Sequence, residues 1–114
     1  MDCIFCKIIK GEIPSQKVYE DDKMLIFKDI DPKAKIHLLA VPKRHYGFLE
    51  EMQAQDKEDI GYILSKIAAL KDDLGLQEGY RLTINQGKDA GQTVFHLHIH
   101  IMGGQSLGWP DFKE

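Results

Sequence analysis

Apolar side chains recur at two different periods along the chain, and each period predicts a different element. Short apolar or alternating runs, bounded by Gly, Pro and charged turns, are typical of strands. We expect five strands, within residues 17–21, 24–30, 35–42, 80–85 and 94–102. One segment between the third and fourth strands instead repeats apolar residues three and four positions apart, which predicts a helix.

That helical segment covers residues 49–76, with one apolar face formed by Ile60, Ile63, Leu64, Ile67, Ala68 and Leu70. Gly75 is suited to a C-terminal cap. A short N-terminal helix is expected over residues 3–10, before the break GEIP. The order of strands, helix and strands predicts an α+β fold: an antiparallel five-stranded sheet with one main helix and a short N-terminal helix.

The last expected strand contains three histidines at alternate positions, in the run TVFHLHIHIM. In an extended strand His96, His98 and His100 share one face, with neighbours about 6.5 to 7 Å apart. The other face would carry Phe95, Leu97, Ile99 and Ile101 and pack under the main helix. A half-exposed strand with polar outward positions is the alternative, but three imidazoles in register favour a site for a small ligand, anion or metal on an open sheet face.

Length and composition restrict the class of protein. The 114 residues fit one domain, 1–114, with 43% hydrophobic and 29% charged residues and a formal net charge of −3. No basic excess is present to neutralise a nucleic acid, and no apolar run reaches the roughly 18 residues of a membrane span. The N-terminus does not resemble a signal peptide, and the whole chain has only two cysteines. We therefore expect a cytoplasmic protein without a structural disulfide.

The loop NQGKDAGQT runs directly into the histidine run and has the composition of an anion site. Gly87 and Gly91 permit tight turns, while Gly91, Gln92 and Thr93 offer amide groups and a hydroxyl to a phosphate. A neutral imidazole is a good nucleophile toward phosphorus, provided that its tautomer is fixed. His98 is central in the row, so its neighbours can orient it while His100 or Thr93 contacts the phosphoryl oxygens.

The run HLHIHIM resembles the His-x-His-x-His-x-x signature of the histidine triad (HIT) family, and matches extend over residues 3–22, 29–45, 79–92 and the Gly-Gly and Trp that follow the triad. The sequence is most similar to the Hint branch of purine nucleoside phosphoramidases. That resemblance implies hydrolysis of purine nucleoside 5′-phosphoramidates, such as adenosine 5′-monophosphoramidate, to a nucleoside monophosphate and an amine. It also implies a homodimer in which two sheets join.

The resemblance also implies roles for individual residues. His98 would form a nucleotidyl-histidine intermediate, the carbonyl of His96 would hold its tautomer, His100 would contact the α-phosphate, and His37 would complete the polar cluster. Thr93 stands where close relatives have Ser. The implied substrate contacts are Asp29 to the ribose, Ile8, Phe27, Ile30 and Leu39 around the base, Asn85, Gly91, Gln92 and Thr93 at the phosphate and leaving group, and Trp109 across the dimer.

The pair Cys3 and Cys6 has the spacing of either a redox motif or half of a zinc site. A thioredoxin-type pair follows a strand, and none precedes residue 3. His45 and His96 can complete a tetrahedral Cys₂His₂ site, a pattern found in some HIT relatives, and four protein ligands would make the zinc structural. Two small buried hydrophobic residues are the alternative.

Three other functions stay open from the sequence. The protein could be a zinc-stabilised nucleotide-binding module with little turnover, or a HIT hydrolase acting on dinucleoside polyphosphates. The triad could also be a catalytic metal site, but three ligands along one straight strand would form a row about 13 Å long, which does not suit a tetrahedral ion.

Overall fold

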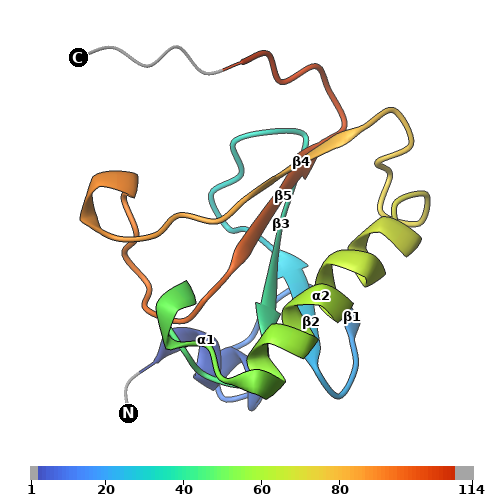
Figure 1. The fold of residues 1–114 in the computed structure, drawn as a ribbon. Coiled ribbons are helices and arrows are strands. Elements are labelled where there is room, and N and C mark those ends of the chain that lie inside the picture. Colours follow the sequence, from blue (N-terminus) through green and yellow to red (C-terminus); the bar gives the residue numbers. More distant parts are fainter. Residues whose placement is uncertain (1–2, 110–114) are drawn as a thin grey trace.

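The computed structural model describes residues 3–109, and the fold is an antiparallel sheet with helices on both faces (Figure 1). The sheet has five strands in the order β1-β2-β3-β5-β4, and every neighbouring pair is antiparallel. The α+β prediction is therefore confirmed. The elements are α1 (Ile4–Ile9), β1 (Lys17–Glu20), β2 (Met24–Lys28), β3 (Ile36–Pro42), α2 (Ala54–Ala69), β4 (Tyr80–Thr83) and β5 (Ile99–Gly103), with short 3₁₀ turns at Leu49–Glu51 and Lys88–Ala90.

The central strands β2 and β3 are apolar on both faces because each face is covered by a different helix. One face packs against α2 in a core of Met24, Ile26, Leu38, Ala40, Ile63, Ile67, Leu76, Ile99 and Ile101. The opposite face packs against α1 in a second core of Cys3, Phe5, Ile8, Leu25, Phe27, Leu39 and Val41. The expectation of an open face beside the histidines is therefore wrong, since α1 covers part of it.

The helix α2 buries a narrower stripe than its sequence indicates. Ile63 and Ile67 are fully buried, whereas Leu64 is 40% exposed and Ala68 is also exposed. The helix ends at Ala69, and the predicted cap Gly75 lies beyond it, in the turns that follow, with φ +78°. Within residues 3–109, no helix is long and apolar enough to cross a membrane.

The histidine strand is shorter than predicted, because β5 begins only at Ile99. His96 and His98 precede the strand, in a segment attached to the loop after β3 by a bond from the Leu97 amide to the Tyr46 carbonyl, 2.6 Å. Phe95 does not pack under α2: it is 54% exposed and its ring lies 5.8 Å from that of Phe48. The three imidazoles therefore do not form one straight row.

Candidate active site and metal centre

Two of the triad histidines meet on the sheet face that α1 partly covers. The rings of His98 and His100 lie 5.1 Å apart. In the strand register His100 is paired with Leu39 on β3 and with Thr83 on β4, and Leu39 is paired with Phe27 on β2. Directly paired residues share a face, so a line of side chains runs across the sheet from Phe27 to Thr83, with His100 between them.

The ring of His98 is held in a single orientation by the backbone. Its Nδ1 lies 2.8 Å from the carbonyl oxygen of His96. A carbonyl can only accept a hydrogen bond, so Nδ1 carries the proton and donates it. The neutral His98 ring therefore has its lone pair on Nε2, which is the form required of a nucleophile.

His37 and His100 form a second oriented pair. The Lys33 amide donates to His37 Nδ1 at 3.0 Å, so the proton of neutral His37 is on Nε2 and is donated to His100 Nδ1, 2.9 Å away. Asp29 Oδ2 lies 3.3 Å from the same Nε2. The proton of neutral His100 is therefore on Nε2, as a donor to a phosphoryl oxygen.

Burial favours these neutral forms. It lowers the pKa of His37, against the opposing charge of Asp29, and it lowers the pKa of His100 to about 4, with the neighbouring rings of His98 and His37 contributing. Both rings are therefore neutral near pH 7, and the pair donates hydrogen bonds in a fixed direction.

The loop that contains Gly87 and Gly91, beside the triad, is held in place by hydrogen bonds from its own residue Gln92. Gly87 and Gly91 have φ values of +84° and +77°, which only glycine adopts readily. The side chain of Gln92 is buried: its Oε1 accepts from the Gly87 amide at 2.8 Å, and its Nε2 donates to the Gly47 carbonyl at 3.0 Å. Gln92 thus shapes the loop with its side chain, while Thr93 is exposed and Asn85 half-buried.

Of the four apolar residues expected around a nucleotide base, three lie in one cluster and the fourth does not. Ile8, Phe27 and Leu39 are buried in the core beneath α1, in line with His100. Ile30 is fully exposed and is not part of that cluster. Asp29 is half-buried, with its carboxylate 3.3 Å from the His37 ring. The three core residues form a closely packed apolar cluster, since Ile8, Phe27 and Leu39 are only 4% to 7% exposed. Ile30 makes no contribution to this cluster.

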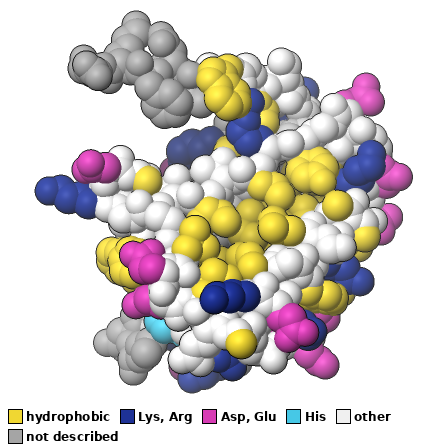
Figure 2. Space-filling model, viewed as in Figure 1, with side chains coloured by type: hydrophobic (Ala, Val, Ile, Leu, Met, Phe, Trp, Pro, Cys, Tyr) yellow, Lys and Arg dark blue, Asp and Glu magenta, His cyan; other side chains and the backbone are white. Residues whose placement is uncertain are grey.

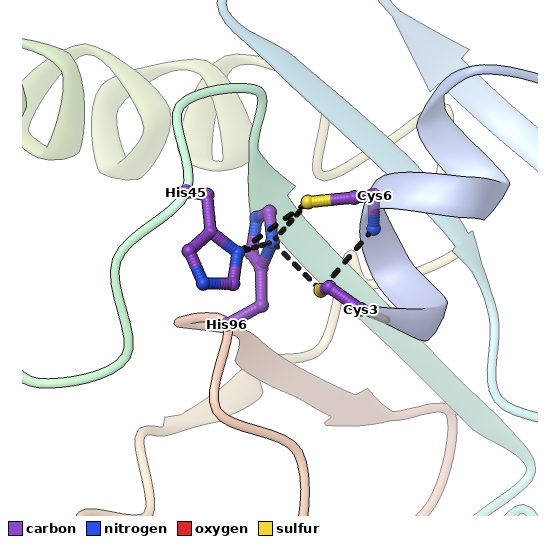
Figure 3. Close-up of side chains that lie close together, drawn as sticks. All are labelled: Cys3, Cys6, His45 and His96. Carbon is purple, nitrogen blue, oxygen red and sulfur yellow. Dashed lines mark hydrogen bonds between the residues drawn. The ribbon is translucent and has the colours of Figure 1, made fainter. Parts of the chain in front are cut away.

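The four predicted metal ligands lie together at the end of α1 (Figure 3). Cys3 and Cys6 come from α1 and its N-cap, His45 from the loop after β3, and His96 from the segment before β5. Cys3 Sγ is 3.4 Å from His96 Nδ1, Cys6 Sγ is 3.4 Å from His45 Nδ1 and 3.5 Å from His96 Nδ1, and the two Nδ1 atoms are 3.1 Å apart.

These distances fit a tetrahedral zinc ion. Zn–N bonds of about 2.05 Å and Zn–S bonds of about 2.3 Å place two ligand nitrogens ~3.3 Å apart and a nitrogen and a sulfur ~3.6 Å apart. His96 Nε2 donates to the Pro42 carbonyl at 2.7 Å, so the His96 lone pair is on Nδ1 and faces the cysteines. Burial lowers the pKa of His96 to about 4, which keeps that lone pair available at neutral pH.

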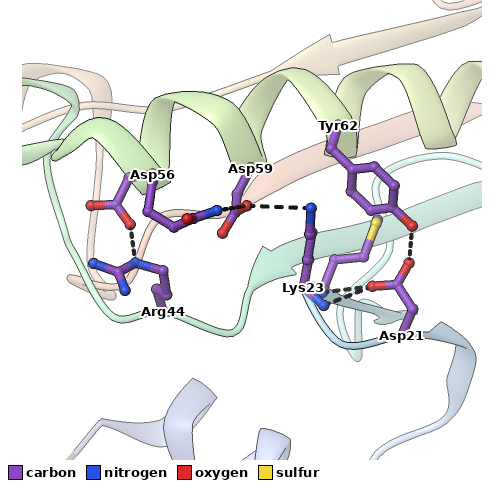
Figure 4. Close-up of polar contacts among 8 residues, drawn as sticks. Asp21, Lys23, Arg44, Asp56, Asp59 and Tyr62 are labelled. Atoms are coloured by element: carbon purple, nitrogen blue, oxygen red, sulfur yellow. Dashed lines mark hydrogen bonds and ion pairs between the residues drawn. The ribbon is translucent and has the colours of Figure 1, made fainter.

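The other polar contacts around α2 serve the fold (Figure 4). Asp56, in the first turn of the helix, accepts from the Gln53 amide and from Arg44 Nε, the latter at 2.6 Å. Asp21 accepts from the Tyr62 hydroxyl and from the amides of the turn that follows it. These carboxylates are used by helix and turn contacts, which leaves the histidine face as the candidate active site.

Comparisons with known proteins agree with this fold. The HIT domain family profile matches residues 10–107. A 14 kDa zinc-binding protein of Zea mays is 44% identical over 94% of this chain and 85% of its own. A HIT family hydrolase from Legionella pneumophila superimposes with a TM-score of 0.90 at 42% identity, covering 96% of this chain and 98% of its own. A histidine triad nucleotide-binding protein from Candida albicans has a TM-score of 0.80 at 37% identity, covering 99% and 86%.

The protein belongs to the HIT family.

Two residues near the triad, Phe5 and Thr83, were not predicted from the sequence. Phe5 contacts the His98 ring edge-on, with ring centroids 5.1 Å apart, and Thr83 is paired with His100 across the sheet. The alternation in YRLT could have shown Thr83 opposite the apolar face of β4. Phe5 lies in a short helix between two cysteines, and nothing in the sequence shows which sheet face that helix covers.

Proposed function

We propose that this protein hydrolyses purine nucleoside 5′-phosphoramidates through a covalent nucleotidyl-histidine intermediate. The observation that carries the proposal is the His98 ring, whose Nδ1–H is used by the His96 carbonyl and whose Nε2 lone pair is free to attack. His100 next to it offers an Nε2–H to the phosphoryl oxygens. A nucleophile and an adjacent hydrogen-bond donor are the two groups that phosphoryl transfer requires.

The reaction proceeds in two displacements at phosphorus. In the first, His98 Nε2 bonds to the α-phosphorus, the P–N bond to the substrate amine breaks, and the amine leaves with that electron pair and takes up a proton from solvent. In the second, water attacks the same phosphorus and loses a proton to solvent, and the P–N bond to His98 breaks with its electron pair returning to Nε2. This restores the neutral ring and releases the monophosphate. His100 stabilises the phosphoryl oxygens in both steps, because its donor direction is set by His37.

We assign the nucleoside to the region beside this pair where Ile8, Phe27 and Leu39 pack together. These three side chains would contact a purine, and Asp29, which lies 3.3 Å from His37 Nε2, would accept from the ribose hydroxyls. Asn85, Gly91, Gln92 and Thr93 would contact the phosphate and the leaving group, Gln92 through its backbone because its side chain is used within the loop. The methyl group of Thr93 would narrow the leaving-group side relative to Ser.

The decisive experiment compares substrates. The purified protein is incubated with adenosine 5′-monophosphoramidate and, separately, with dinucleoside polyphosphates, and nucleoside monophosphate release is followed. We expect release of AMP and ammonia from the phosphoramidate at the higher kcat/KM. Preferential cleavage of the polyphosphates would show that dinucleoside polyphosphates, and not phosphoramidates, are the substrate class. Tight AMP binding without turnover of either substrate would show that the protein is a nucleotide-binding module.

We propose zinc as the ion held by Cys3, Cys6, His45 and His96. Four protein ligands leave no position for substrate, so the ion would act on structure and not as a Lewis acid. The donor set, two sulfurs and two neutral imidazoles, is the one that zinc prefers among common divalent metals. We further propose a cytoplasmic location, where thiol ligands stay reduced.

We also propose a homodimer formed through β4. This strand lies at one edge of the sheet, so one side of its backbone has no strand partner among residues 3–109. Figure 2 shows hydrophobic side chains gathered between α2 and β4, where Ile60, Leu82 and Ile84 are only partly buried and Leu64 is 40% exposed. An unpaired strand beside an apolar surface is suited to association with a second copy.

A further inference from the structure

Phe5 connects the metal centre to the proposed nucleophile. It lies in α1 between Cys3 and Cys6 and is 7% exposed. Its ring is 5.1 Å from the His98 ring at an interplanar angle of 85°, and 6.0 Å from the His96 ring at 71°. Both are edge-to-face contacts of the kind that aromatic rings favour. The contact restricts the rotation of His98 about its side-chain bonds.

The position of Phe5 depends on what holds α1. The helix has only six residues, far below the length at which an isolated helix is stable in water. Cys3 caps its start, accepting from the Cys6 amide at 3.3 Å, and the sulfurs of both cysteines meet His45 and His96. A metal ion bound there would tie α1 to the loop after β3 and to the segment before β5.

His96 provides a second connection between the same two sites. Its imidazole faces the cysteines through Nδ1 and the Pro42 carbonyl through Nε2, and it is fully buried. Its main-chain carbonyl accepts the Nδ1–H of His98. A displacement of the His96 ring would therefore move the group that fixes the tautomer of His98.

We propose that Phe5 is a positioning residue for His98, and that metal binding at the Cys₂His₂ centre fixes the nucleophile through Phe5 and the His96 carbonyl together. This inference rests on the proposed function, in which His98 attacks phosphorus and zinc occupies the centre. The metal centre then acts on the rate of the chemical step as well as on stability. Nucleotide affinity changes little, because Phe27, Leu39 and Asp29 come from β2, β3 and the turn after β2, and of the expected base contacts in the core only Ile8 comes from α1.

The first test replaces Phe5 by Leu, which keeps an apolar side chain in the core but removes the ring. We expect kcat for the phosphoramidate to fall about 5- to 20-fold, with the Kd for AMP within about twofold of the wild type and zinc still bound. Ile63→Val, in the separate core beneath α2, controls for general loss of packing and should leave kcat unchanged. A raised KM with unchanged kcat would overturn the proposal, since Phe5 would then serve only as a wall for the nucleotide.

The second test needs no turnover. The ¹⁵N chemical shifts of the His98 ring are compared at pH 8 in zinc-loaded and chelator-treated wild-type protein. We expect a single Nδ1–H tautomer with zinc, a mixture of tautomers without it, and recovery when zinc is returned. A pure Nδ1–H tautomer in both states would overturn the coupling. Because this signal does not depend on substrate, it separates failure of the coupling from failure of the proposed phosphoramidase activity.

Discussion

Three histidines of the site, His37, His96 and His98, each have one ring nitrogen occupied by a backbone group. The His96 carbonyl accepts from His98, the Pro42 carbonyl accepts from His96, and the Lys33 amide donates to His37. A backbone carbonyl or amide has a fixed role in a hydrogen bond, so each contact determines which nitrogen carries the proton. The chemistry assigned to the remaining nitrogens therefore follows from the fold and not from the imidazoles alone.

Replacing His98 by Asn tests the covalent step directly. We expect phosphoramidate turnover to fall by at least about 10³-fold, because the amide cannot form the P–N bond, while the Kd for AMP changes little. Rate assays and calorimetric titration with AMP measure the two effects. Turnover near the wild-type value would contradict a nucleophilic His98. Trapping of a nucleotidyl adduct on the wild type, by acid quench and mass spectrometry, distinguishes the nucleophile from a general base.

Acid should destabilise the fold partly through His100. Its pKa falls from 6.5 in the unfolded chain to about 4 in the folded one, mainly through burial, and the groups facing it are His98, His37, Asp29 and Lys33. Between these pH values the unfolded chain binds more protons than the folded one. The free energy of unfolding of the protein therefore decreases as the pH is lowered through 6.5 toward 4.

The change His100→Asn should remove that contribution. We expect the variant to lose less unfolding free energy than the wild type between pH 7.5 and pH 5, because Asn does not titrate. Urea denaturation at the two pH values measures the difference, with both proteins in the same metal-loaded state. Equal losses in the two proteins would show that His100 does not contribute to the acid sensitivity.

The sequence predicted the kinds of side chain in the site better than their surroundings. The spacing of the two cysteines, together with the pattern of some HIT relatives, predicted one cluster of Cys3, Cys6, His45 and His96, and the structure brings those four together. The exposure of Ile30 and the use of the Gln92 side chain within the loop could not be predicted, because both depend on contacts between segments distant in the chain. Local pattern contains no information about such contacts.

The loop between β4 and β5 depends on one buried amide side chain. Gln92→Ala would leave the half-buried Gly87 amide without its partner and would remove one of the two donors to the buried Gly47 carbonyl, which keeps Gln86 Nε2. We expect a loss of about 1 to 3 kcal/mol in the free energy of unfolding, measured with urea. Gln77→Ala is the matched control: Gln77 makes one exposed bond to the Asp72 carbonyl, so its loss should stay within about 0.5 kcal/mol. Similar losses for both variants would contradict the assigned role.

Metal removal should act first on α1. We expect about one zinc per chain by elemental analysis, and a chelator should lower the melting temperature by at least about 10 °C, since saturating a site at 1,000 times its Kd contributes about 4 kcal/mol. Returning zinc should restore the original value. An unchanged melting temperature, with both thiols freely reactive, would favour the alternative of two buried hydrophobic cysteines.

The strand that follows the first two triad histidines is shorter than the alternation of apolar and polar residues predicts. Alternation from Phe95 to Ile101 predicts one continuous strand, and from Ile99 onward this is correct. Upstream, the ring of His96 is drawn into the Cys₂His₂ cluster and the Leu97 amide bonds to the loop after β3. These long-range contacts replace the ladder hydrogen bonds, and alternation alone cannot distinguish the two cases.

The segment after β5 lies next to the edge strand at which we propose that the dimer forms. Arg81 is on the edge strand β4, and its guanidinium carbon lies 5.5 Å from the centre of the Trp109 ring. Trp109 is 81% exposed, so no core of its own protomer encloses it. If two copies join at β4, the contact with Arg81 places both tryptophans at the interface, where each can approach the partner's histidine face.

Trp109→Ala should therefore change which amines the enzyme releases. In a homodimer the indole would border the leaving-group side of the partner's site and not the side that holds the base. We expect the ratio of kcat/KM values across a series of small and aromatic amine leaving groups to change by about fivefold or more, with the Kd for AMP within about twofold. Trp109→Phe, which keeps an aromatic ring over Arg81, should restore most of the wild-type ranking. Sedimentation equilibrium at micromolar concentration tests the premise, since a monomer would remove it. A dimer with an unchanged amine ranking would show that the tail does not reach the partner's site.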